Sequence, residues 1–337
     1  MVRAAWKRLL SDASIQRSSQ TLSVVGTNAF VYGGELRPRE PVDSAVYRIS
    51  VGSDTVPETA ISTITGLPNA PPSRVGAAST TVAGKVYIFS GRGGTAMAPI
   101  EEKGAFWVFD PSTGNGEWSR IHPADSQAPY PVGRSYHALT SDGKETIFLH
   151  AGCPEKGRLS DLWAFNVTSG KWTELPQAPG PERGGTSIAY ADGKIYRLNG
   201  FDGKTEQGGA LDVFDVENKT WKTIEYPADG ANGPGPRSVS CLLALSINGK
   251  LSLVTMFGEH DPSSLGHQGA GKMLSDVWAF DIESEKWNEV VVEGERPSSR
   301  GWFDAGVLDG SSIVLHGGLA ESNERLGDAW LLEFAKA

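Results

Sequence analysis

Short apolar runs recur along the chain, and polar residues, glycine or proline separate them. Apolar and aromatic residues dominate segments such as 29–32 and 86–89, and a glycine follows each of these within two residues. Runs of this length, rich in β-branched and aromatic residues, predict strands. Asp-Gly pairs at 142–143 and 192–193 suit the tight turns of hairpins. The pattern predicts an all-β chain of short antiparallel strands.

The predicted strands belong to a repeat with two independent markers. An arginine precedes the first strand of each unit, at Arg17, Arg74, Arg134, Arg183, Arg237 and Arg300. A glycine follows the second strand, at Gly34, Gly91, Gly152, Gly200, Gly258 and Gly318. Units of this size with four strands each are typical of a β-propeller. We therefore predict one domain over residues 1–337, a six-bladed β-propeller. Its expected units one to six span approximately residues 11–66, 67–123, 124–177, 178–228, 229–293 and 294–334 plus 4–10.

The two ends of the chain predict how the ring closes. The fourth strand of several units carries a tryptophan, as at Trp118 and Trp172, but the last unit stops after its third strand. The N-terminal segment 6–9 resembles the start of those tryptophan-bearing strands. We expect this segment to complete the last unit, because ring closure removes an open sheet edge.

Composition and charge narrow the function classes. The chain has 31 basic and 40 acidic residues, a net charge of −9, and no long run of Lys or Arg. A nucleic-acid partner is not expected, because phosphate binding needs a dense basic surface. The sequence contains no apolar run of about 18 residues, the length that would indicate a membrane span. Two cysteines are too few for a disulfide framework, so we expect a cytoplasmic protein. We also expect it to be a monomer.

The repeat places the marker arginines at one opening of the ring. In an antiparallel blade, the start of the first strand and the end of the second lie on the same face. The six arginines and the loops that follow the glycines should therefore converge there, together with Arg92. Guanidinium groups recognise sulfate, phosphate and carboxylate, so the opening is a candidate site for a small anionic molecule. The alternative is that most of these arginines bind backbone carbonyls of the adjacent blade.

The loop after Gly258 departs from the other units. It separates Gly258 from Asp276 by 17 residues and concentrates Glu259, Asp261 and His267. Long loops in a compact domain are often functional, and carboxylates with imidazoles suit Fe(II), Mn or Zn. The alternative is that Glu259 and His267 only hold the loop against neighbouring blades through hydrogen bonds.

The units resemble kelch repeats. The resemblance rests on the Gly-Gly pairs at 33–34 and 317–318, which are followed by an aromatic residue and then by tryptophan. Together with Gly258-Glu259 and the long His-bearing loop, the units resemble the plant specifier proteins, which include nitrile-specifier, epithiospecifier and thiocyanate-forming proteins. This resemblance implies Fe(II)-dependent redirection of glucosinolate aglucones. The family's Glu-x3-Asp-x3-His iron pattern is matched by Glu259 and His267, with Ser263 at the middle position.

The resemblance also implies roles for individual residues. Arg74 and Arg134 would hold the substrate sulfate, and with Glu259 and His267 they form the expected catalytic set. Arg92, Arg183, Arg237 and Arg300 would line the substrate site, and Glu259, His267 and Asp261 are the candidate metal ligands. Two functions remain open. One is metal-assisted lyase or isomerase chemistry on a sulfated or carboxylated substrate, and the other is a non-catalytic scaffold for protein partners.

Overall fold

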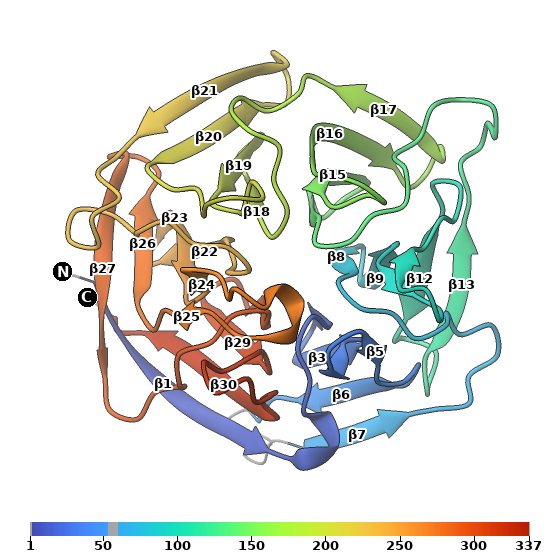
Figure 1. The fold of residues 1–337 in the computed structure, drawn as a ribbon, viewed down its shortest axis with the longest axis horizontal. Helices are drawn as coiled ribbons and strands as arrows, with labels where there is room; N and C mark the ends of the chain where they lie inside the picture. Colours follow the sequence, from blue (N-terminus) through green and yellow to red (C-terminus); the bar gives the residue numbers. More distant parts are fainter. Residues whose placement is uncertain (1, 53–59, 337) are drawn as a thin grey trace.

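The computed structural model describes residues 2–52 and 60–336, which form small antiparallel sheets arranged in a ring around a central opening (Figure 1). The described residues contain strands and two short 3₁₀ helices, η1 (Ala13–Ile15) and η2 (Gly266–Gln268), so the all-β prediction is confirmed. No helix among them is long and apolar enough to cross a membrane.

Four of the sheets have four strands each, and within each of them the strands pair in chain order. They contain β2 (Thr21–Val25), β3 (Asn28–Tyr32), β6 (Val46–Ser50) and β7 (Ala60–Ile64); β8 (Ala78–Val82), β9 (Lys85–Phe89), β12 (Phe106–Asp110) and β13 (Glu117–Ile121); β14 (Ala138–Ser141), β15 (Thr146–Gly152), β16 (Leu159–Asn166) and β17 (Lys171–Leu175); and β18 (Ser187–Ala191), β19 (Lys194–Leu198), β20 (Ala210–Asp215) and β21 (Thr220–Glu225).

A larger sheet of eight strands brings the two termini together. Its order is β22 (Leu243–Ile247), β23 (Lys250–Met256), β26 (Val277–Asp281), β27 (Lys286–Glu293), β1 (Val2–Ser11), β30 (Asp328–Phe334), β29 (Ser312–His316) and β28 (Asp304–Leu308). Strand β1 runs antiparallel to β30, from Ala4 opposite Phe334 to Ser11 opposite Asp328, and parallel to β27 on its other side. The N- and C-termini therefore lie side by side at the rim (Figure 1).

Three two-stranded ribbons extend from the ends of the second strands. They are β4 (Glu35–Arg37) with β5 (Glu40–Pro41), β10 (Arg92–Gly93) with β11 (Ala98–Pro99), and β24 (Glu259–His260) with β25 (Lys272–Met273). The last ribbon and η2 belong to the unit-five loop, residues 259–273, which reaches toward the centre of the ring in Figure 1. The long loop is thus held over the opening by its own strand pairing.

Apolar side chains fill the spaces between neighbouring sheets. Trp172 stacks on Phe106 of the preceding sheet at a ring-centroid distance of 5.4 Å, and Phe165 lies 4.9 Å from the same tryptophan. Such aromatic pairs contribute about 0.5–1.5 kcal/mol each beyond the burial of their area. Each sheet is therefore stable only against its neighbours, and this packing keeps the loops at the opening in fixed relative positions.

Candidate functional site

The six marker arginines are buried, and all of them except Arg183 pair with a carboxylate. The guanidinium of Arg134 donates two hydrogen bonds to Asp161, at 2.7 Å and 2.9 Å, and Trp163 donates to the same carboxylate at 2.8 Å. The same arrangement recurs elsewhere in the ring. The corresponding pairs are Arg74–Glu102, Arg237–Asp276 and Arg300–Asp328, whereas Arg17 makes a single contact of 3.5 Å with Asp43. Because each arginine of these pairs is neutralised by one carboxylate, the pairs order the ring from within.

The backbone at the same positions links one unit to the next. The Arg134 carbonyl accepts a hydrogen bond of 2.8 Å from the amide of Gly91, and the other marker arginines accept in the same way from the glycine of the preceding unit. Each side chain also donates to a carbonyl of its own unit, as Arg134 does to Ala151 at 3.0 Å. The sequence leaves open the alternative that most of these arginine side chains bind backbone carbonyls of the adjacent blade. In the structure, the carbonyls that they bind belong to their own unit. A role for Arg74, Arg134, Arg237 and Arg300 in anion binding stays a prediction.

Two further candidate arginines lie differently. Arg92, half-buried, donates to Ser135 Oγ at 2.7 Å and to the carbonyls of Met97 and Pro154 at 3.1 Å and 2.9 Å. It thereby ties the β10–β11 ribbon to the loop of the next unit. Arg183 is buried and donates to the Asn199 carbonyl at 3.0 Å, and among the described residues no carboxylate forms an ion pair with it.

A cavity of about 220 Å³ opens where the unit-five loop meets the loops of the two preceding units. Its walls include Glu259, Arg158, Cys153, Phe201, Tyr136 and Trp302. We call it the mouth pocket. The combination of a cation, a buried acid and aromatic walls fits a small anion that carries an apolar group.

Arg158 is the cation of the mouth pocket, and sequence reasoning missed it. Its guanidinium lies over the ring of Phe201 at 4.9 Å, and its buried Nε has no hydrogen-bond partner among the described residues. Gly203 makes room for it, because a Cβ there would lie 2.7 Å from Arg158 Nη1. Arg158 belongs to no repeated position, so only the fold reveals that it faces the unit-five loop.

Glu259 is the acid of the mouth pocket, as the sequence predicted for this opening. Strand β24 holds it through reciprocal backbone bonds of 2.9 Å with Ser238, and its Oε1 accepts a bond of 2.7 Å from the amide of Gly271. Burial raises the pKa of Glu259 to about 7, and the nearby carboxylate of Glu206 adds to the rise. The group therefore exchanges a proton near neutral pH.

Of the other two predicted metal ligands, the structure describes the side chain of Asp261 only. Asp261 is exposed, and its Oδ2 lies 3.3 Å from Nδ1 of its neighbour His260. The backbone of His267 belongs to η2, but its side chain lies outside the described residues. Within residues 2–52 and 60–336, no group of three His, Cys, Asp or Glu side chains is placed to hold a metal ion. The described donors alone do not fit an iron centre.

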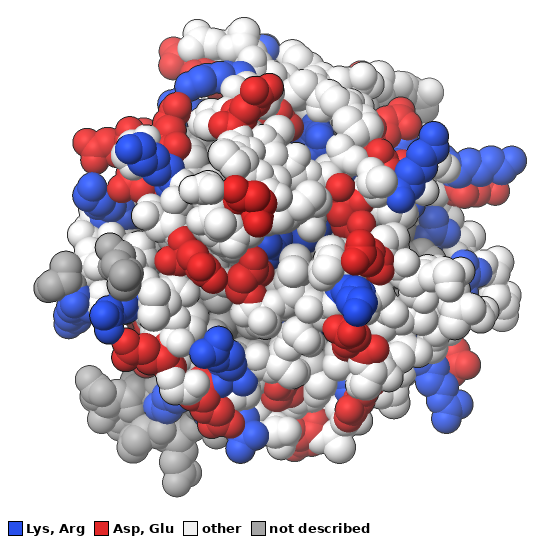
Figure 2. Space-filling view, turned by 60° about the vertical axis from the view of Figure 1, so that its left-hand side comes forward, with Lys and Arg blue, Asp and Glu red and all other residues white. Residues whose placement is uncertain are grey.

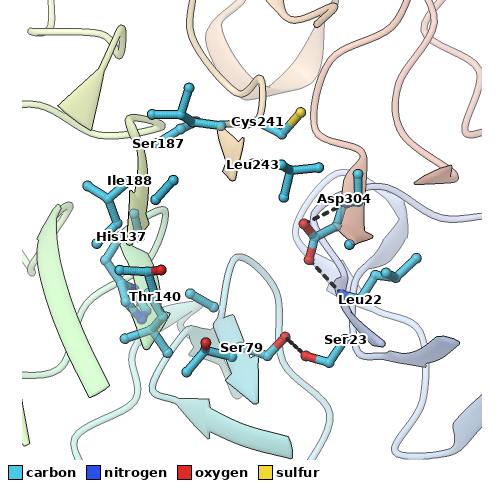
Figure 3. Close-up of a pocket in the computed structure, with 18 of the residues that line it drawn as sticks. Leu22, Ser23, Ser79, His137, Thr140, Ser187, Ile188, Cys241, Leu243 and Asp304 are labelled. Carbon is cyan, nitrogen blue, oxygen red and sulfur yellow. Dashed lines mark hydrogen bonds between the residues drawn. The ribbon is translucent and has the colours of Figure 1, made fainter. Parts of the chain in front are cut away.

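A second cavity of about 410 Å³ is the central channel, lined by the innermost strand of each unit (Figure 3). Asp304 accepts hydrogen bonds from the amides of Leu22 at 2.6 Å and Ala305 at 2.8 Å, and burial raises its pKa to about 7. Ser23 and Ser79 bond to each other across two units at 2.8 Å. Burial lowers the pKa of His137 to about 3, so this histidine is neutral at pH 7. The channel is polar but carries little charge.

The face of the molecule seen in Figure 2 shows no single sign of charge. Lys and Arg side chains are interspersed with Asp and Glu over the face seen in Figure 2. The positive charge of Arg158 is therefore a local feature of the mouth pocket, in a chain whose net charge is −9.

Fold and repeat place this chain among the kelch propellers. Residues 19–255 match the model of the KLHDC2/KLHL20/DRC7 Kelch-repeats domain, so the chain belongs to the kelch-repeat family. The solved structure of YjhT superposes with a TM-score of 0.73 over 97% of this chain and 99% of that chain, at 14% identity. That likeness shows the fold.

Among individual relatives, the chain is similar to a specifier-type protein over nearly its full length. An N-(sulfonatooxy)prop-2-enimidothioate sulfolyase of Thlaspi arvense is 27% identical over 342 residues, which covers 93% of this chain and 91% of the relative. The predicted resemblance to kelch propellers of the specifier type is thereby confirmed. The chain is also similar to the leucine-zipper-like transcriptional regulator 1 homolog of Drosophila melanogaster, at 24% identity over 98% of this chain but 32% of the relative.

Proposed function

We propose that this kelch propeller binds a small anionic molecule, sulfated or carboxylated, in the mouth pocket and promotes its lyase-type cleavage or rearrangement. The observation that carries the proposal is the meeting of Arg158, Glu259 and aromatic side chains in one cavity. The sulfolyase relative acts, by its name, on a sulfated imidothioate, which has an anionic end and an apolar end. The mouth pocket offers a matching surface for each end.

The anionic end of such a substrate would pair with Arg158. Its guanidinium packs on Phe201 and has an unpartnered Nε, and a planar guanidinium binds sulfate or carboxylate through two N–H groups. The apolar end would contact Phe201 and Trp302. As sulfate departs, its growing negative charge would be stabilised by the same guanidinium.

Glu259 would act as the proton-transfer group. With its pKa raised to about 7, its carboxyl is present in both protonation states at neutral pH. An acid or base of this kind is efficient when its pKa lies near the working pH. Gly271 keeps one carboxylate oxygen in place, which leaves the other free to face a substrate.

Iron binding is a separate part of the proposal. Glu259, His267 and Asp261 are its candidate ligands, and Fe(II) would supply Lewis-acid or redox chemistry. Because Ser263 stands at the middle position and the described donors do not complete a site, no step above depends on the metal. Elemental analysis of untagged protein purified under reducing conditions tests it, and Glu259→Gln is expected to lower the iron content.

We also propose that the repeats form six blades and that β1 closes the ring as the outer strand of the last one. The pairing of β1 with β30 over most of its length supports this arrangement. A monomeric protein in the cytoplasm stays a prediction.

Arg158→Gln tests the proposed binding directly. Trp302 lines the pocket, so its fluorescence should report titration with sulfate or with freshly prepared N-(sulfonatooxy)prop-2-enimidothioate. We expect wild-type protein and the control Lys171→Gln, which changes an exposed cation of β17, to bind and to alter the product distribution. Arg158→Gln should weaken binding at least tenfold. Equal titrations for all three proteins, with products identical to those in buffer, would refute the proposal.

The second candidate function is a non-catalytic scaffold for protein partners. Leu265, at the tip of the unit-five loop, is 69% exposed, and an apolar tip of this kind can contact another protein. The chain also matches only 40% of the putative adagio-like protein 2 of Oryza sativa subsp. japonica, so the same repeats occur within longer proteins. A partner that is captured by wild-type protein but lost with Leu265→Asp, together with no response to sulfate, would favour this function.

A further inference from the structure

The fourth unit departs from the one-to-one pairing of buried arginine and carboxylate. Strand register aligns Ala210 with Asp161: Leu211 pairs with Leu198 and Leu162 pairs with His150, and each partner stands two residues before the marker glycine of its unit. Arg183 therefore faces alanine where Arg134 faces a carboxylate. The nearest replacement, Asp212, stands at the position of Trp163.

A second arginine is buried in the same unit. Arg197 lies on β19 and is fully buried, at a position where most other units hold an apolar residue, such as Ile88 or Leu149, and unit five holds Thr255. Its Nε lies 3.5 Å from Oδ2 of Asp212. Asp212 also accepts a hydrogen bond of 2.7 Å from Thr223 Oγ1, so its carboxylate is shared.

The charges of this cluster do not balance. Arg183 and Arg197 contribute two positive charges, and among the described residues Asp212 is the one buried carboxylate beside them. The neighbouring Asp161 already pairs with Arg134, and Asp202 lies near the surface, where it bonds to the amides of Lys204 and Thr205. One positive charge is left over inside the protein.

The same cluster contains polar hydrogens with no acceptor. Among the described residues, Arg197 Nη1 and Nη2, Arg183 Nε and Asn199 Nδ2 are buried and have no hydrogen-bond partner. An unmade buried hydrogen bond costs about 1–3 kcal/mol, and more at a charged group. His150 Nε2, on the facing strand β15, is an unpartnered acceptor, because Nδ1 of the same neutral ring donates to the Asp161 carbonyl at 2.7 Å.

Deprotonation does not relieve the imbalance at neutral pH. Burial and the charge of Arg183 lower the pKa of Arg197 to about 9, which still leaves it protonated at pH 7. A buried charge is normally stabilised by pairing or by a bound ion of opposite sign. The cluster therefore calls for an acceptor that carries one negative charge.

We propose that Arg183, Arg197 and Asn199 form a binding site for a buried monovalent anion of halide size, such as chloride, between the sheets of β14–β17 and β18–β21. A single charge balances the cluster, whereas a doubly charged sulfate or phosphate would overcompensate it. A spherical acceptor also accommodates N–H donors that arrive from several directions. The site lies apart from the residues that line the mouth pocket and the central channel, so this inference does not depend on the proposed function.

Thermal unfolding in chloride and in gluconate at equal ionic strength tests the site. We expect the Tm of wild-type protein to rise on the order of 2 °C for each tenfold increase in chloride. Arg197→Leu, which introduces an apolar residue as in most of the other units, should lose this dependence. The control Lys171→Leu, an exposed substitution on β17, should keep it.

Diffraction from crystals grown in bromide gives a readout that needs no variant. An anomalous peak within hydrogen-bonding distance of Arg197 and Arg183 is expected. Equal Tm values for wild-type protein in both salts, with no bromide peak, would overturn the proposal and would mean that the donors bond to water alone.

Discussion

Trp6→Ala tests whether the N-terminal strand holds the ring together. Trp6 is 7% exposed and belongs to the apolar cluster between β23, β29 and β30, where its ring lies 6.0 Å from that of Phe257. Removing a buried tryptophan costs roughly 3–5 kcal/mol through lost burial and the cavity that remains. Since β1 pairs with both β30 and β27, this loss falls where the first and last parts of the chain meet.

The expected effect is large enough for a simple assay. At about 2 °C per kcal/mol for a chain of this size, the Tm should fall by roughly 6–10 °C in thermal unfolding followed by circular dichroism. Lys7→Ala is the matched control, because Lys7 is the next residue of the same strand and is exposed. It should change the Tm by less than about 1 °C. If Trp6→Ala unfolds at the wild-type temperature, β1 does not contribute to closure and the reasoning fails.

Two further predictions concern the buried charges. Asp161→Asn leaves the guanidinium of Arg134 buried without a counter-ion and should lower the free energy of unfolding by about 3–5 kcal/mol, measured by urea denaturation; a loss below about 1 kcal/mol would contradict a structural role for these pairs. Glu259 has a pKa of about 7 in the folded protein against an ordinary 4.5, so the stability it contributes is full below pH 4.5 and is lost as the pH rises through 7. Glu259→Gln should therefore flatten the pH dependence of Tm between these values, and an unchanged slope would argue against the buried acid.

The repeat made most of the fold predictable, because its signals are local. Alternating apolar residues and Asp-Gly turns act over a few residues, so the strands around Phe89 and the hairpin at 142–143 follow from the sequence. The recurrence of arginine also indicated that Glu259 and the loop after Gly258 lie at the same opening as the marker arginines, and the structure places Glu259 in the mouth pocket. The partners of those arginines were harder to foresee, because Asp161 lies 27 residues from Arg134 along the chain. The recurring Asp-x-Trp at 161–163 was the available signal.

Sequence by itself determined the strand pattern, the kelch repeat and the unusual length of the unit-five loop. Only the tertiary structure decided which side chains share a cavity. Arg158 and Phe201 come from different units and repeat nowhere, yet they meet Glu259 in the mouth pocket. It likewise decided that Asp212 lies against Arg197 and that no described carboxylate forms an ion pair with Arg183. The physical reason is that periodicity reports which residues face a neighbour, whereas charge balance and burial depend on which neighbour the closed ring brings there.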